Sequence, residues 1–156
     1  MSDYAEVPYE SLPIPDSHPE RLAALGYLFG LSPADPASCR VLELGCASGG
    51  NLVPLAFYLP RSRYLGIDLY ANQIAAGQSL IDAVGLDNIE LRQGDILDLD
   101  PGSLGRFDYV IVHGVYSWVP DAVRERILSL CAAALEPHGI AYVSYNTLPG
   151  WRMRGM

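Results

Sequence analysis

A glycine-rich turn carries the clearest chemical pattern in the sequence. The apolar run 41–44 (VLEL) leads into the segment 45–51 (GCASGGN), and a helical run follows. Glycine adopts positive φ angles and leaves amide groups uncovered, so a ligand can lie against the backbone at the start of that helix. An acidic residue, Glu43, stands two positions before the first glycine. The spacing is G-x-x-x-G-G, whereas a dinucleotide pyrophosphate site needs G-x-G-x-x-G.

Two further carboxylates stand at the ends of neighbouring strand-like runs. Asp68 ends the run 64–68 (YLGID), and Asp95 follows the run 89–93. Because the carboxyl ends of parallel strands meet at one edge of a sheet, we expect these two residues and Glu43 to line one crevice.

The three acidic residues favour one ligand over another. Asp68 alone decides nothing, since a carboxylate after the second strand can accept both ribose hydroxyls of NAD or of S-adenosylmethionine. An acid placed for an adenine amino group after the third strand is less expected of a nicotinamide enzyme. S-adenosylmethionine has no phosphate and carries an ammonium group and a sulfonium centre, which suit an acidic first strand. A purely structural turn, with Asp95 in an Asx-turn, is the alternative without a ligand.

Short β-type runs alternate with longer helical runs, which is typical of βαβ units and a parallel sheet. The pattern predicts strands at 40–44, 63–68, 89–93, 109–113 and 140–145, and helices at 18–29, 51–59, 71–84 and 121–135. Ser17 and Glu20 predict a capping box for the first helix, and Pro137-His138-Gly139 predicts the turn that ends the last one. We therefore expect an α/β fold, a doubly wound Rossmann-like parallel sheet of about five strands.

The chain divides into two parts by composition. Residues 1–38 should form an N-terminal arm, a first helix and a linker, and residues 39–156 the ligand-binding core. Prolines at 8, 13 and 15 predict an extended arm over residues 1–16. Tyr4 and Tyr9 are predicted to fold back over the mouth of the site as a lid.

Composition excludes several functional classes. With 156 residues, half of them apolar, the chain can bury the core of one domain. The net charge of −8 opposes phosphate neutralisation and disfavours a nucleic-acid partner. The three cysteines, without a CxxC pair, indicate neither disulfides nor a metal site. No apolar run approaches a membrane span, and the acidic, proline-rich N-terminus is unlike a signal peptide. We expect a cytoplasmic protein without a membrane partner.

The segment after the fourth predicted strand carries the candidate catalytic residues, His113 and Tyr116. If the acceptor is an amine, its proton must leave, and a nearby histidine or tyrosine could receive it. Aromatic faces, including that of Trp118, could also hold a cationic amine or shield a sulfonium. In the alternative reading, His113 is a satisfied structural residue and Trp118 a packing anchor. The sequence His-Gly-Val-Tyr replaces the Asn/Asp-Pro-Pro-aromatic run expected of a DNA amino-methyltransferase.

The segment 43–51 (ELGCASGGN) resembles motif I of class I S-adenosylmethionine-dependent methyltransferases. Four further segments resemble the bacterial subgroup with a methyltransferase regulatory domain after its catalytic core: 4–9 (YAEVPY), 19–22 (PERL), 113–120 (HGVYSWVP) and 145–151 (YNTLPGW). That subgroup includes enzymes similar to rickettsial protein-lysine methyltransferases. The resemblance implies S-adenosylmethionine as cofactor, in-line methyl transfer, and an acceptor that is a protein lysine ahead of a small molecule.

The resemblance also assigns residues to parts of the cofactor. It implies that Glu43, Gly45, Gly49 and Asn51 line the methionine end. Asp68 would hold the ribose, and Asp95 with Ile96 the adenine. Four further residues are expected to contribute to the same site: Cys46, Ala47, Leu69 and His113.

The fuller class I fold carries an antiparallel pair of strands beyond the fifth. No sequence remains here to form them or a regulatory domain, so we expect a truncated core. Two alternatives remain open, an NAD-type oxidoreductase and a catalytically silent cofactor-binding fragment.

Overall fold

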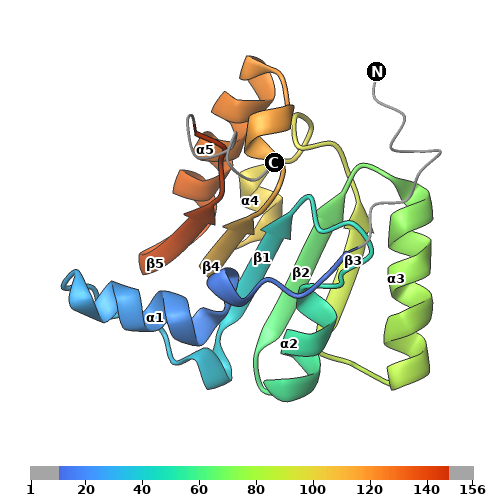
Figure 1. The fold of residues 1–156 in the computed structure, drawn as a ribbon, viewed down its shortest axis with the longest axis horizontal. Helices are drawn as coiled ribbons and strands as arrows, with labels where there is room; N and C mark the ends of the chain where they lie inside the picture. Colours follow the sequence, from blue (N-terminus) through green and yellow to red (C-terminus); the bar gives the residue numbers. More distant parts are fainter. Residues whose placement is uncertain (1–10, 148–156) are drawn as a thin grey trace, which may run out of the picture.

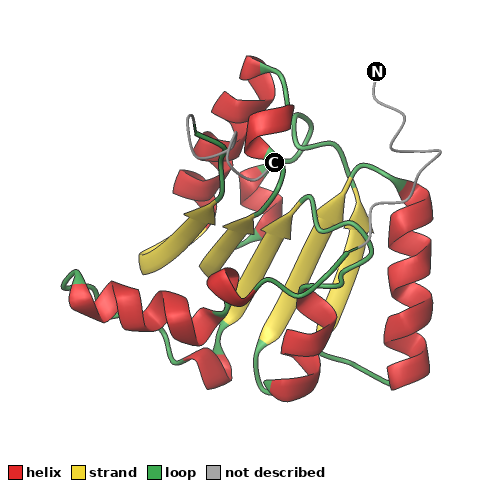
Figure 2. Cartoon of the chain, in the orientation of Figure 1, coloured by secondary structure: helices red, strands yellow, loops and turns green. Residues whose placement is uncertain are grey.

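A computed structural model describes residues 11–147, which form a parallel β-sheet covered by helices (Figures 1 and 2). The strands are β1 (Arg40–Leu44), β2 (Arg63–Asp68), β3 (Ile89–Gln93), β4 (Phe107–Val112) and β5 (Leu135–Val143). The helices are α1 (Pro19–Leu28), α2 (Leu52–Tyr58), α3 (Ala71–Val84), α4 (Pro101–Leu104) and α5 (Asp121–Ala134). Short 3₁₀ turns lie at η1 (Pro15–Ser17), η2 (Pro36–Ser38) and η3 (Tyr116–Trp118). None of these helices is long and apolar enough to cross a bilayer.

Both faces of the central strands β1, β2 and β4 are buried, which explains their nearly continuous apolar runs. Alternate residues point to opposite faces, so Val41 and Ile111 pack with α1, α2 and α3. Their neighbours Leu42 and Val110 pack with α5 on the other face. Leu22 and Ala23 of α1 belong to the first of these clusters, so the first helix shares the core of the sheet.

The strand order β3-β2-β1-β4-β5 places a topological switch point between β1 and β4. From β1 the chain winds outward through β2 to β3, then returns to β4 beside β1 and winds outward to β5. In open α/β sheets, ligands bind at the carboxyl ends of the strands where the winding reverses. The predicted doubly wound sheet is confirmed, and Glu43, paired with Ile111 of β4, lies next to this point.

The turn predicted at residues 137–139 does not end the last helix. Helix α5 ends at Ala134, and β5 starts at once, with Leu135 opposite Phe107 of β4. The register then shifts before Ile140 pairs with Tyr109, so the intervening residues form an irregularity inside the strand. His138 there has a φ of 67°. The turn-forming residues therefore lie within an irregular part of β5 and not at the end of a helix.

The predicted capping box at Ser17 and Glu20 is also wrong. His18 is the residue that caps α1, and its Nδ1 accepts a hydrogen bond from the amide of Glu20 at 3.2 Å. Pro19 occupies the first helical position, which its fixed φ favours, and this places Ser17 one residue too early to cap. Ser17 is instead fully buried in the 3₁₀ turn before the helix. The predicted tyrosine lid, Tyr4 and Tyr9, lies outside the described residues.

Candidate functional site

Glu43 is a deeply buried carboxylate at the centre of the carboxyl edge. Its side chain is on β1, only 3% of the residue is exposed, and Oε1 accepts a hydrogen bond from Asn51 Nδ2 at 3.1 Å. Its other oxygen, Oε2, is buried without a hydrogen-bond partner among the described residues. Burial raises the pKa of Glu43 to about 7, the Asn51 hydrogen bond opposes this, and the charge of Asp68 adds to it. A buried oxygen with free lone pairs is suited to a cationic donor such as an ammonium group.

The turn after Glu43 takes backbone conformations that favour glycine. Gly45 and Gly49 have φ angles of 77° and 76°, and Ala47 also has a positive φ, of 48°. A Cβ atom on Gly45 would lie 2.3 Å from Cγ2 of Val115. Gly45 therefore allows the turn to approach the segment after β4, which the sequence spacing alone does not reveal.

Replacing Gly45 with alanine should destabilise the protein by roughly 3 kcal/mol, because the positive φ and the clash with Val115 act together. Gly85 is a matched control, since it has a φ of 74° and a Cβ atom there would meet no other atom within 4 Å. Gly85→Ala should cost only about 1 kcal/mol. Chemical denaturation of the two variants measures the difference, and equal losses would show that Val115 imposes no constraint on the turn.

Asp68 fastens the turn to the end of β2. Its Oδ2 accepts a hydrogen bond from the amide of Ala47 at 2.8 Å, and its Oδ1 accepts one from the amide of Tyr70 at 3.0 Å. Each carboxylate oxygen can accept a further hydrogen bond. Asp68 thus holds the unusual backbone at Ala47 and keeps acceptor capacity at the carboxyl edge of the sheet.

Asn51 links Glu43 to the segment before α1. Its Nδ2 donates to Ser17 Oγ at 3.0 Å as well as to Glu43, and its Oδ1 accepts from the amide of Ile14 at 2.9 Å. The amide of the neighbouring Gly50 donates to Ser11 Oγ at 2.9 Å. Figure 1 shows this N-terminal segment, in dark blue, crossing in front of β1 and β2. The contacts with this segment join residues at least 34 positions apart, and no local pattern in the sequence indicates them.

The predicted adenine residues lie in the loop after β3. The Oδ1 atom of Asp95 accepts from the amide of Leu97 at 2.9 Å, which is an Asx-turn, and Ile96 packs partly buried against the α5-side core. The amide of Gly94 donates to the carbonyl of Asp68 at 2.9 Å and ties this loop to β2. Leu69 is half exposed beside the same loop. Asp95 therefore follows β3 at the carboxyl edge of the sheet, and its carboxylate also accepts a hydrogen bond within the local Asx-turn.

His113 directly follows β4 on the face that carries Glu43 and Ile111. Its ring stacks on that of Tyr142 with centroids 6.0 Å apart and an interplanar angle of 8°. Its Nδ1 lies 3.4 Å from Tyr142 Oη. Burial lowers the pKa of His113, and the charge of Asp16 opposes that shift. Sequence patterns do not single out Tyr142, and only the β4–β5 register could have placed it beside β4.

Tyr116 contacts the core on the α5 side of the sheet. Its side chain packs partly buried against the α5-side core, and its carbonyl accepts a hydrogen bond from Arg124 Nε at 3.0 Å. Trp118, at the end of the same turn, is 60% exposed. The structure therefore brings His113 together with Tyr142, while the role predicted for Tyr116 stays a prediction.

The cysteines and acidic residues give no metal centre in the described part of the chain, where no three potential ligands group together. Cys46 of the turn is buried, and burial raises the pKa of its thiol. A protonated thiol is a poor nucleophile, so Cys46 acts here as a small side chain under the loop.

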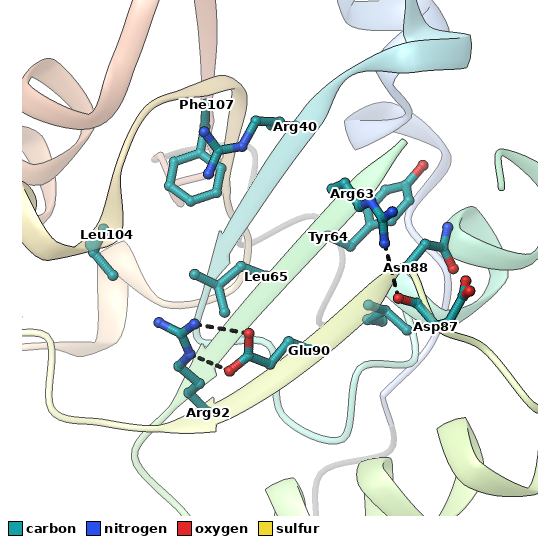
Figure 3. Close-up of a pocket in the computed structure, with 11 residues that line it drawn as sticks. Arg40, Arg63, Tyr64, Leu65, Asp87, Asn88, Glu90, Arg92, Leu104 and Phe107 are labelled. Carbon is teal, nitrogen blue, oxygen red and sulfur yellow. Dashed lines mark hydrogen bonds and ion pairs between the residues drawn. The ribbon is translucent and has the colours of Figure 1, made fainter. Parts of the chain in front are cut away.

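A separate pocket of about 230 Å³ is lined by residues of β1, β2, β3 and β4 (Figure 3). Arg40, Arg63 and Phe107, the first residues of three strands, line it, so it opens toward the amino ends of the sheet. Leu65 in its wall faces the α5 side, opposite Glu43. Parallel strands place their amino ends away from the edge that carries Glu43 and Asp68. This pocket is therefore distinct from the candidate site.

Known proteins are similar to this chain in sequence and in fold. Residues 41–139 match the profile of a family described as a methyltransferase domain. Two uncharacterised proteins of Rickettsia prowazekii (strain Madrid E) are 48% identical over 150 residues and 44% identical over 151 residues. The alignments cover 96% and 97% of this chain, and 27% and 60% of those proteins.

A solved structure is also similar, that of PKMT2 from Rickettsia typhi in complex with AdoHcy. It matches with a TM-score of 0.88 at 45% identity, covering 94% of this chain and 28% of that one. The chain thus spans only part of the length of these relatives. The family match covers more than half of the chain and includes the glycine turn, Asp68 and His113. On this basis the chain belongs to the methyltransferase-domain family.

Proposed function

We propose that this chain is the S-adenosylmethionine-binding core of a class I methyltransferase. The observation that carries the proposal is the buried Oε2 of Glu43, which lacks a partner among the described residues and lies beneath a glycine turn held by Asp68. A ligand with an ammonium group and a ribose fits both groups at once. The R. typhi relative, whose structure contains AdoHcy, supports the same ligand class. The family match favours this reading over an NAD-type oxidoreductase.

In this proposal different residues contact different parts of the ligand. In this proposal Glu43 accepts a hydrogen bond from the ammonium group, and the turn lets the methionine chain approach the backbone. The residues of the turn that take part are Gly45, Cys46, Ala47, Gly49 and Asn51. Asp68 accepts from the ribose with Leu69 beside it, and Asp95 and Ile96 lie at the adenine.

In this proposal the chain positions the methyl donor and the acceptor, and it accepts a proton from the acceptor. S-adenosylmethionine, when bound, supplies a methyl group from its sulfonium centre, and the sulfur leaves as a neutral thioether. In this proposal the donor would bind at the switch point beside β4, and His113, which follows β4, would face the acceptor. His113 is placed to receive the proton of an amine acceptor, because burial favours its neutral form.

A protein lysine is the acceptor we propose. The resemblance to rickettsial protein-lysine methyltransferases supports it, and the net charge of −8 favours a cationic acceptor over a polyanionic nucleic acid. The three cysteines are free and buried in the described structure, which supports a reducing, cytoplasmic location.

Calorimetry of the chain with S-adenosylhomocysteine and, separately, with NADH tests the ligand. We expect binding heat with the first and none with the second. The reverse result would replace the methyltransferase by an oxidoreductase.

Methyl transfer is tested with labelled S-adenosylmethionine and a bacterial lysate as the source of acceptors. All ten basic residues of the chain are arginine, so methyl-lysine recovered after hydrolysis comes from an acceptor and not from the chain itself. We expect labelled lysine with the wild-type chain and a large loss with Asp68→Ala. Equal labelling by both proteins would exclude this site as its source.

A further inference from the structure

Tyr142 and His113 form a pair that joins two neighbouring strands at the candidate site. Tyr142 of β5 pairs in register with Ile111 of β4, and His113 lies two residues beyond Ile111. The near-parallel rings and the 3.4 Å distance from Nδ1 to Oη bring the polar atoms of the two side chains within reach. The pair is 29 positions apart in the sequence, so the fold alone brings the two rings together.

The pair faces the side of the sheet that carries Glu43. Side chains alternate along β4, so His113 points to the same face as Ile111, and Ile111 packs with the α1, α2 and α3 side. Tyr142 packs partly buried against that same cluster. Glu43 of the adjacent β1 pairs with Ile111. The methionine end of the ligand and the His113–Tyr142 pair therefore share one face at the switch point.

Two charged groups from the N-terminal segment act on the pair. Asp16 of η1 lies near both rings, and Arg21 of α1 lies near Tyr142. Asp16 and Arg21 form an ion pair at 2.9 Å, so their charges largely offset each other. Burial is the larger influence, and it lowers the pKa of His113 and raises that of Tyr142. Both side chains are therefore neutral near pH 7.

A neutral histidine has one nitrogen that donates and one that accepts. The Tyr142 hydroxyl can accept from Nδ1 or donate to it, depending on the tautomer of His113. When Nδ1 carries the hydrogen and donates to Tyr142 Oη, the lone pair is on Nε2. The ring then presents a base on the side away from Tyr142. Fixing the tautomer through the other ring nitrogen is a common way to prepare a histidine for proton transfer.

We propose that Tyr142 is a positioning residue that fixes His113 as the acceptor of a proton from a cationic amine, so the group methylated is an amine. This inference rests on the methyltransferase function proposed above. One N–H bond of the ammonium breaks, its electron pair stays on nitrogen, and the proton passes to Nε2 of His113 and then to water. The lone pair left on nitrogen is the one that methylation requires. A carboxylate acceptor has no proton to lose and would not use this pair.

The tautomer of His113 can be read by NMR without any reaction. The chain has three histidines, at 18, 113 and 138, and a His113→Gln variant identifies the resonances of interest. In the wild-type chain with bound S-adenosylhomocysteine, we expect His113 protonated on Nδ1. Tyr142→Phe should shift the population toward protonation on Nε2. Tyr58→Phe, at an exposed site on α2, is the matched control and should leave the resonances unchanged.

Kinetics with a lysine-containing acceptor supply the second measurement. At pH 7 we expect Tyr142→Phe to lower kcat by about 10- to 100-fold without changing the KM for S-adenosylmethionine. The defect should shrink above about pH 10, where the free amine no longer needs a base. A merely structural role would lower kcat equally at every pH.

Each outcome decides between the two proposals. A wild-type His113 protonated on Nε2 would overturn the inference even if Tyr142→Phe failed to fold. So would a variant with an altered tautomer and an unchanged pH profile. In both cases, binding of S-adenosylhomocysteine would leave the proposed function intact, whereas absence of that binding would refute the proposed function itself.

Discussion

Replacing Asp68 with alanine should lower the affinity for S-adenosylhomocysteine by about 100- to 1000-fold. The substitution removes the proposed acceptor for the ribose and also frees the amides of Ala47 and Tyr70, which donate to Asp68. Hydrogen bonds to a charged group contribute about 1.5–3 kcal/mol each, so losing more than one has an effect of this size. Ala47, at a φ of 48°, is then no longer held in its strained conformation. Calorimetric titration measures the affinity.

Two comparisons separate binding from folding in this experiment. Asp98→Ala makes the same change of charge at an exposed position after β3 and should bind like the wild type. Thermal unfolding without ligand reports how far Asp68→Ala weakens the protein itself. A variant that binds within about threefold of the wild type would mean that Asp68 only shapes the turn and does not touch the ligand.

The inner part of the fold could be predicted because its signals are local. The bounds of β1, β2, β3 and α3 follow from short apolar runs and a long helical run bounded by polar residues. The start of β5 could not be predicted in the same way. Pro137, His138 and Gly139 have the chemistry of a turn, but pairing with β4 incorporates them into a strand with a shifted register. Tertiary pairing overrides local preference at this position.

In the candidate site, too, the features with local sequence signals could be predicted and those that depend on tertiary contacts could not. Glu43 and Asp68 could be placed at one edge because each stands at or near the end of a strand, and parallel strands end together. The hydrogen bonds of Asn51 with Ile14 and Ser17 could not, since they depend on how the N-terminal segment crosses the sheet. The local pattern predicts Ser17 as a helix cap, whereas its buried hydroxyl accepts a hydrogen bond from Asn51 and so supports the site.

The pKa of Glu43 should make both stability and ligand binding depend on pH. Burial raises this pKa from 4.5 to about 7, so the folded protein holds a proton that the unfolded chain has released. The resulting stabilisation is complete below about pH 4.5 and is lost as the pH rises through 7. The shift corresponds to roughly 3 kcal/mol. Glutamine does not ionise, so the Glu43→Gln variant keeps its stability where the wild type loses it. The free energy of unfolding of the variant, relative to that of the wild type, should therefore rise by about 3 kcal/mol between pH 4.5 and about pH 8.

Ligand binding should favour the ionised form of Glu43, whereas folding favours its protonated form. The ammonium group of S-adenosylhomocysteine favours ionised Glu43, so binding at pH 6 should release close to one proton per site, about 0.9 if the pKa is 7. Titrations in buffers of different ionisation enthalpy measure that number. Glu43→Gln should release none and bind at least about 100-fold more weakly, since the ammonium loses its charged partner. The exposed Glu125→Gln is the control and should match the wild type. Proton release that persisted in Glu43→Gln would assign the coupling to another group and remove Glu43 from the ammonium site.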